Sequence, residues 1–201
     1  MGDPKRIKKK YSTPRHPFER DRIDRELQLV GKYGLRNMHA IWKHSTMLRT
    51  IRGNVRHLLS LPVEDENRQK EENAILGRLQ RLGFIEEGAT LDDVLSLKID
   101  VVLNRRLQTL VHKKGMAVTP HHARQMVTHG HIVIGERVRK SPSYLVPVEE
   151  EDMINYASNS PYNNPKHVSL PEQVQEQAKE HRASQRKKRG GGRRSRRSRR
   201  K

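Results

Sequence analysis

Apolar residues recur at helical spacing from residue 19 to about residue 130, and the period changes to that of short strands only afterwards. Three segments carry the helical pattern and are predicted to be amphipathic helices: 19–33, about 36–59 and 65–82. The segment TLDDVLSL begins with Thr90, which is suited to cap a further helix. After residue 131, IVIGERV predicts a β-hairpin and SPSYLVPV a further short strand. The expected fold class is α+β and mostly helical.

Charge limits both the core and the partners of this chain. Lys and Arg together number 42 against 23 Asp and Glu, so the net charge is +19, and hydrophobic residues make up only 32% of 201. The core must therefore be small. No apolar run is long enough to span a bilayer, and no apolar segment follows the basic N-terminus, so no signal peptide is expected. The absence of cysteine excludes disulfides and thiolate zinc ligands. Such a charge predicts a polyanionic partner, nucleic acid before a membrane surface.

Basic residues are concentrated in separate segments. Residues 61–103 hold ten acidic and five basic residues, whereas residues 104–148 hold eight basic and one acidic. The first 18 residues combine three prolines with six Lys and Arg, which predicts an extended basic arm. The C-terminal RKKRGGGRRSRRSRRK is built from Lys, Arg, Gly and Ser, so it is expected to be disordered when free and to order along phosphate. A nuclear-localisation role is the alternative for that segment, and a membrane role lacks apolar anchors.

Two helices are predicted between residues 99 and 128. The first is expected to bury one apolar row: Leu103, Leu107, Leu110 and Val111. Its opposite face is predicted to carry Arg105, Gln108 and His112, with Arg106 at the flank. Thr119 should cap the second helix, with Pro120 at the first position, where a missing N–H costs nothing. On that helix the buried face should consist of Ala123, Met126 and Val127. The opposite face should present four polar side chains: His121, Arg124, Gln125 and Thr128.

Four histidines fall within thirteen positions: His121, His122, His129 and His131. A metal site is disfavoured, because His122 and His129 lie two helical turns apart, about 10.5 Å, and one ion cannot bridge that distance. Catalysis would need a carboxylate or base partner, and Glu136 is the only acid in residues 104–148. A merely solvated polar face remains an alternative. The interpretation we favour is contact with nucleic acid, in which Arg and His meet phosphate and sugar oxygens.

The segment RRLQTLVHKKGMAVTPHHARQMVTHGHIVIGERVRKSPSYLV resembles the RNA-binding module named after small-subunit ribosomal protein S4. Its marks are the Arg-Leu helix, ARQ on the second helix, HGHI, a short hairpin with glycine, and PSYLV. DPKRIKKKYSTPRHPFE and GLRN resemble the archaeal and eukaryotic form of that family, and GDPKR favours the archaeal form. The likeness covers roughly residues 1–165. The module alone also occurs in pseudouridine synthases and tyrosyl-tRNA synthetases.

The resemblance implies a primary binder of small-subunit ribosomal RNA that helps nucleate subunit assembly, lies near the messenger entry and, with neighbouring ribosomal proteins, supports translational accuracy. Some bacterial members hold zinc through N-terminal cysteines, which this chain lacks. We therefore expect a cytoplasmic, ribosomal, non-enzymatic protein with no cofactor, metal, membrane or small-molecule partner. The alternatives are a stand-alone RNA-modification or RNA-quality factor using the same module, and a DNA-compacting protein.

The expected organisation has four parts: an extended arm (1–18), a helical body (19–98), the RNA-binding module (99–165) and a basic extension (166–201). The module is expected to supply most of the RNA-binding residues, with further contacts from the arm and from the second helix. The predicted RNA-binding residues are Arg105, Arg106, Gln108, Lys113, Lys114, Thr119, His121, His122, Arg124, Gln125, His129, His131, Arg15, Arg52 and Arg56.

Overall fold

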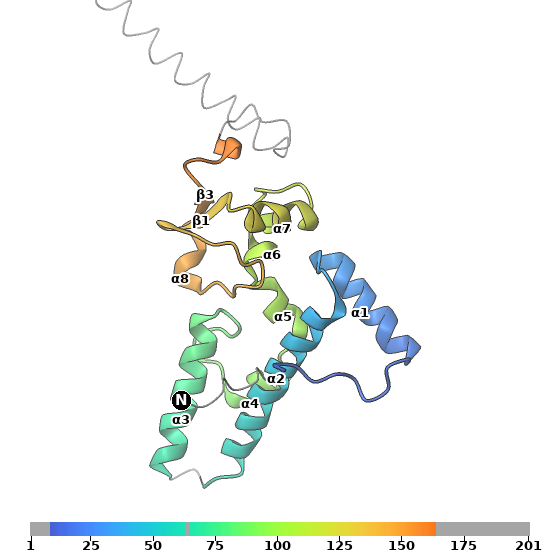
Figure 1. Cartoon of the computed structure of the whole chain (residues 1–201). Coiled ribbons are helices and arrows are strands. Elements are labelled where there is room, and N and C mark those ends of the chain that lie inside the picture. Colours follow the sequence, from blue (N-terminus) through green and yellow to red (C-terminus); the bar gives the residue numbers. More distant parts are fainter. Residues whose placement is uncertain (1–8, 63–64, 164–201) are drawn as a thin grey trace, which may run out of the picture.

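A helical body and a smaller mixed module make up the described part of this computed structural model, which covers residues 9–62 and 65–163 (Figure 1). The body contains α1 (Arg20–Tyr33), α2 (Met38–Leu59), α3 (Glu66–Arg81), α4 (Leu91–Ser96) and α5 (Ile99–Asn104). The module contains α6 (Leu107–Lys113), α7 (Pro120–Thr128), β1 (Ile132–Ile134), β2 (Arg137–Val138), α8 (Val148–Glu151), β3 (Ile154–Tyr156) and the 3-10 helix η1 (Pro161–Asn163). The mostly helical α+β fold class is confirmed.

The helices of the body follow the predicted segments to within a few residues. Helix α2 is the centre of this part, because α1, α3, α4 and α5 all pack against it. The predicted start at Thr90 is also confirmed. The Asp93 carboxylate accepts hydrogen bonds from the Thr90 backbone N–H at 2.8 Å and from its hydroxyl at 3.0 Å. No helix among the described residues is both long enough and apolar enough to cross a membrane.

The helix predicted around residues 103–112 is interrupted at Arg105 and Arg106, which separate α5 from α6. The cause is the segment 142–146, which pairs with the chain at this point. The Leu107 N–H donates to the Tyr144 carbonyl at 2.8 Å, and the Val146 N–H donates to the Arg105 carbonyl at 3.0 Å. These bonds replace helical ones, so the two halves present different faces from those of one continuous helix.

The hairpin predicted from IVIGERV is confirmed as β1 and β2, with Ile134 opposite Arg137. The strand predicted from SPSYLVPV is wrong, because that segment forms only an isolated bridge between Leu145 and Arg106. The second neighbour of β1 in the sheet is instead β3, which follows α8 in the chain. The resulting antiparallel sheet has the order β2-β1-β3.

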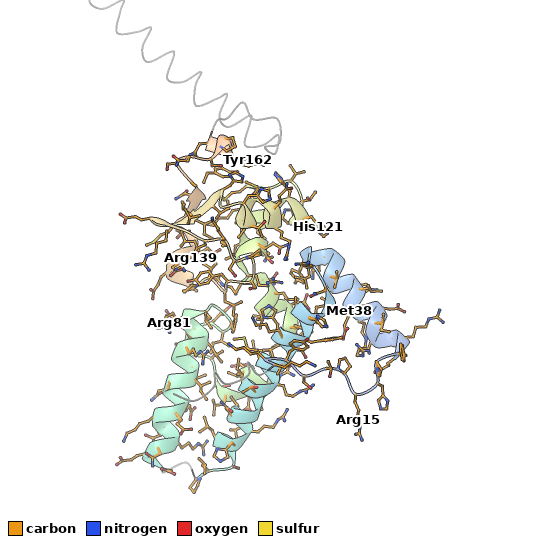
Figure 2. All side chains as sticks on the ribbon, in the orientation of Figure 1. Arg15, Met38, Arg81, His121, Arg139 and Tyr162 are labelled. Carbon is orange, nitrogen blue, oxygen red and sulfur yellow. The ribbon has the colours of Figure 1, made fainter. Side chains whose placement is uncertain are left out.

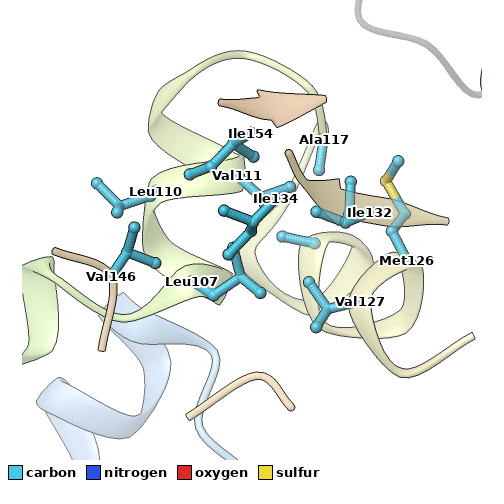
Figure 3. Close-up of a cluster of buried hydrophobic side chains, with 11 residues drawn as sticks. Leu107, Leu110, Val111, Ala117, Met126, Val127, Ile132, Ile134, Val146 and Ile154 are labelled. Atoms are coloured by element: carbon cyan, nitrogen blue, oxygen red, sulfur yellow. The ribbon is translucent and has the colours of Figure 1, made fainter. Parts of the chain in front are cut away.

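Each part of the fold has its own apolar core. In the module, residues from α6, α7, β1 and β3 pack into one cluster, which includes Leu107, Met126 and Ile132 at 0% exposure (Figure 3). In the body, α2, α3 and α4 meet around Val55 and Val94. A third cluster lies within the body, where α1, α2 and α5 meet, and consists of Tyr33, Leu35, Ile41 and Leu103.

Residues 9–18 form an extended arm, of which Tyr11 and Ser12 contact α2. The Ser12 N–H donates to the Thr46 hydroxyl oxygen at 3.0 Å, and the Tyr11 ring lies 5.2 Å from that of His39. Residues 1–8 of the predicted arm and the whole predicted extension 166–201 lie outside the described residues.

Gly34 ends α1 at the point where the body meets the module. Its φ of 58° lies in the left-handed region, which L side chains rarely adopt. A Cβ atom there would lie 2.8 Å from the Pro120 Cβ and 3.0 Å from the Gln108 Nε2. Both backbone conformation and space therefore require glycine at this contact between α1, α6 and α7.

We expect Gly34→Ala to lower the free energy of unfolding by about 1–3 kcal/mol, because left-handed backbone and overpacking both oppose it. Gly53→Ala is the matched control, since Gly53 lies inside α2 with nothing within 4 Å of its Cβ position. It should stabilise by roughly 0.5–1 kcal/mol. Urea unfolding measures both, and equal effects of the two substitutions would contradict the contact.

Candidate nucleic-acid interface

Helix α7 carries the predicted division between a buried and a polar face. The Thr119 hydroxyl accepts from the His122 N–H at 3.1 Å, and Pro120 occupies the first turn, as expected. Ala123, Met126 and Val127 are fully buried in the module core. The opposite face leaves four polar side chains at the surface, with Arg124 half-buried and His121, Gln125 and Thr128 exposed.

Gln108 was predicted to face RNA, and that face assignment is wrong. The side chain is 1% exposed, and its Nε2 lies within hydrogen-bonding distance of three carbonyl oxygens: Tyr33 at 3.1 Å, Gly34 at 2.8 Å and Pro120 at 2.9 Å. The face of α6 opposite the module core packs against the end of α1 and is not exposed to solvent. Gln108 therefore joins the body to the module and does not belong to the RNA surface.

Two of the predicted RNA-binding cations, Arg105 and Lys114, are paired with acidic residues that follow the acid-poor segment 104–148. Arg105 bonds to Glu151 at 2.5 Å and to the Val146 carbonyl at 2.9 Å. Lys114 donates to the Glu151 carbonyl and lies 3.7 Å from the Asp152 carboxylate. The acidic turn around α8 therefore neutralises part of this face. Neighbouring Lys113 is exposed, and it has no ion-pair partner within the described residues.

Arg106 lies at the break between α5 and α6 and is 2% exposed, although the sequence places it at the flank of a solvent-facing surface. Burial, followed by the nearby charge of Arg124, lowers the pKa of Arg106 to about 10. The guanidinium stays charged at neutral pH. It lines a cavity between the body and the module that also meets Arg124.

The histidines separate into two kinds. His121 and His129 are exposed, whereas His122 and His131 are partly buried against the Tyr162 ring, at centroid distances of 5.7 and 5.0 Å. Tyr162, which no sequence pattern singles out, thus closes this end of the module (Figure 2). No group of three or more His, Cys, Asp or Glu side chains in the described ranges is arranged to hold a metal ion.

Helix α2 supplies a second basic surface below the module. A cavity of about 410 Å³ is lined by Arg49, Arg52 and Arg56 together with Ser45, Leu48 and Ile99. Arg52 is half-buried and donates to the Leu97 carbonyl, while Arg56 is exposed. Arg15 of the arm is also exposed, and it lies on the same side of the molecule as His121 in the view of Figure 2, away from Arg81.

Sequence patterns missed the basic residues that meet at the junction itself. Arg36, Lys43 and His44 line the same cavity as Arg106 and Arg124. Burial, reinforced by the charges of Arg106 and Lys43, lowers the pKa of His44 to about 4, so its imidazole is neutral at pH 7. Nothing in the local sequence of α2 indicates that Lys43 meets Arg106 and Arg124 at this cavity.

Comparison with known proteins identifies the module and the whole chain separately. A family model described as the S4 domain matches residues 105–153. Over 177 residues the chain is 51% identical to the small ribosomal subunit protein uS4 of Hyperthermus butylicus, covering 88% of this chain and 98% of that protein. It is 53% identical to the uS4 protein of Ignicoccus hospitalis, with 81% and 96% covered. The uS4 protein of Thermoplasma volcanium is 46% identical, with 92% and 96% covered.

Substitution by alanine should affect stability at Gln108 of α6 but hardly at Gln125 of α7. Gln108→Ala should lower the free energy of unfolding by about 1–3 kcal/mol, because it leaves buried carbonyl oxygens without their donor. Gln125→Ala, on the exposed face of α7, should change it by less than about 0.5 kcal/mol. Thermal or urea unfolding measures the difference. If both variants are as stable as the parent chain, the amide does not join body and module.

Proposed function

The chain belongs to the uS4 family of small ribosomal subunit proteins, and we propose that it is a structural constituent of the small ribosomal subunit that binds ribosomal RNA. The observation that carries the proposal is the exposed polar face of α7 beside the basic face of α2. In this account the protein lies on the small subunit in the cytoplasm and acts by binding, not by catalysis.

The proposed RNA surface is narrower than the one predicted from the sequence. Gln108 no longer belongs to it, because its amide is bonded inside the fold. Arg105 and Lys114 are left out as well, because ion pairs with acidic residues largely neutralise their charges. Contacts of His122 and His131 with RNA stay predictions, because both rings already pack on Tyr162. The residues that remain on the proposed surface are Arg106, Lys113, Thr119, His121, Arg124, Gln125, His129, Arg15, Arg52 and Arg56.

The finer role follows from family membership and from the position of these residues on two parts of the chain. A surface shared by the body and the module can fix two RNA segments relative to each other, which is the task of a protein that nucleates folding of ribosomal RNA. We further propose that the protein contacts neighbouring small-subunit proteins and lies near the messenger entry. With these neighbours it supports translational accuracy. The division into 1–18, 19–98, 99–165 and 166–201 stays a prediction, although α5 (Ile99–Asn104) packs against α2 of the body.

Arg124→Ala should weaken binding to small-subunit ribosomal RNA without unfolding the chain, because the buried face of α7 is unchanged. If about six phosphates are contacted, log affinity should fall with log salt at a slope on the order of −4 to −6, and the variant should reduce that slope by about 1. The control is Arg81→Ala on the exposed end of α3, which should leave both values unchanged. A filter-binding series over salt tests this; equal losses for both variants would argue against α7.

The double variant His121→Ala with His129→Ala should lower RNA affinity severalfold while the unfolding temperature stays the same, because both rings are exposed. The unfolding temperature of the free protein should not respond to EDTA, because no three His, Cys, Asp or Glu side chains in the described ranges are grouped to hold a metal ion. Binding assays measure the affinity, and thermal unfolding with and without chelator measures the stability. Full affinity in the double variant would mean that the histidines are a solvated face only.

A further inference from the structure

A cavity of about 280 Å³ opens where the start of α2 faces the break between α5 and α6. Residues of both the body and the module line it, and all its charged side chains are positive. Four of its lining side chains are cationic: Arg36, Lys43, Arg106 and Arg124. No Asp or Glu is among the described residues that line it.

Arg106 is the buried cation of this cavity, and its charge is not neutralised within the described part of the chain. Its Nε and Nη1 atoms are buried without a hydrogen-bond partner. Arg105 beside it also has a buried Nε, but its other nitrogens bond to Glu151 and to a carbonyl oxygen. A buried cation is costly unless it is paired, so the arrangement calls for an anion that the protein itself does not supply.

The start of α2 adds a second element suited to an anion. Helix α2 has 22 residues, and its N-cap Asn37 forms no side-chain capping bond. The first N–H groups of a helix lack partners within the helix, and the helix dipole makes this end positive. Asn37, His39 and Ala40 of this first turn line the cavity opposite Arg106.

His44 of α2, which also lines the cavity, is compatible with anion binding there. It is 4% exposed and lines the cavity. Because its imidazole is neutral at pH 7, it adds no charge to a site that already holds four cations, and its ring N–H remains available as a donor. The cavity thus presents a buried guanidinium, a helix N-terminus and surrounding basic side chains.

We propose that this cavity binds one phosphate group of the RNA backbone, with Arg106 as its buried anchor and Arg124, Lys43 and the start of α2 around it. The inference rests on the proposed RNA-binding function and names a phosphate-binding site within it. The bound phosphodiester neutralises Arg106 and contacts body and module together. Free inorganic phosphate has the same chemistry, so the test must distinguish the two sources.

Arg106→Met removes the charge but keeps an apolar side chain of similar length. The variant should bind small-subunit ribosomal RNA at least about tenfold more weakly, since a charge-assisted bond to phosphate is lost. The unfolding temperature of the free variant should stay the same or rise, because an unpaired buried cation has been removed. Arg139→Met is the matched control, because Arg139 also has a buried Nε and its guanidinium lies 4.8 Å from the centroid of the Tyr144 ring. It should lower the unfolding temperature with little change in affinity.

Phosphate-ethylation interference on the ribosomal RNA identifies the source of the anion. With the parent protein, ethylation at one phosphate should block binding, and with Arg106→Met the same position should no longer discriminate. Stabilisation of the parent by inorganic phosphate, without any such RNA position, would overturn the proposal in favour of a free anion. Equal RNA affinity of the parent and Arg106→Met would overturn it while leaving RNA binding intact. Failure of the parent to bind the RNA would contradict the proposed function as well.

Discussion

The fold depends on how one buried side-chain amide connects two parts that each have their own core. Gln108 of α6 reaches the carbonyl oxygens of Tyr33 and Gly34 at the end of α1 and that of Pro120 at the start of α7. The left-handed Gly34 brings the backbone close enough for these bonds. The amide therefore sets the position of α7 relative to α1 and α2. The cavity at Arg106 and any RNA surface shared by the two parts exist only in this arrangement.

Acidic residues decide which basic residues are available to a partner. The acids around α8 engage Arg105 and Lys114, and Glu26 engages Arg22 within α1. Arg124 forms no ion pair within residues 9–62 and 65–163, and it faces the junction together with Arg106 and Lys43. The net charge of the module is thus a poor measure of its binding surface. Internal pairing uses some of the cations to hold the fold and leaves others, such as Arg124, for the phosphate contacts that we propose.

Periodicity predicted the local elements well, because each depends on neighbouring residues. The α7 cap at Thr119, its buried face and the β1–β2 hairpin are all confirmed. The break at Arg105 and Arg106 was missed because it depends on pairing with a segment about 40 residues away. Gln108 was misplaced for the same reason, since a polar residue opposite an apolar row usually faces water. Burial of Arg106 and the role of Tyr162 depend on contacts that no local pattern contains.

We propose that RNA crosses the junction between the body and the module over the basic side of α2, and a chain without cysteine allows a direct test. An iron chelate would be attached through single, nearly isosteric Ser→Cys changes: Ser143 at the Arg106 cavity, Ser45 at the arginine surface of α2, and Ser96 near acidic residues as the control. Hydroxyl-radical cleavage of bound small-subunit ribosomal RNA is then mapped. The account predicts strong cleavage from positions 143 and 45 at neighbouring nucleotides, and little from position 96. Cleavage from position 96 as strong as from position 143 would contradict it.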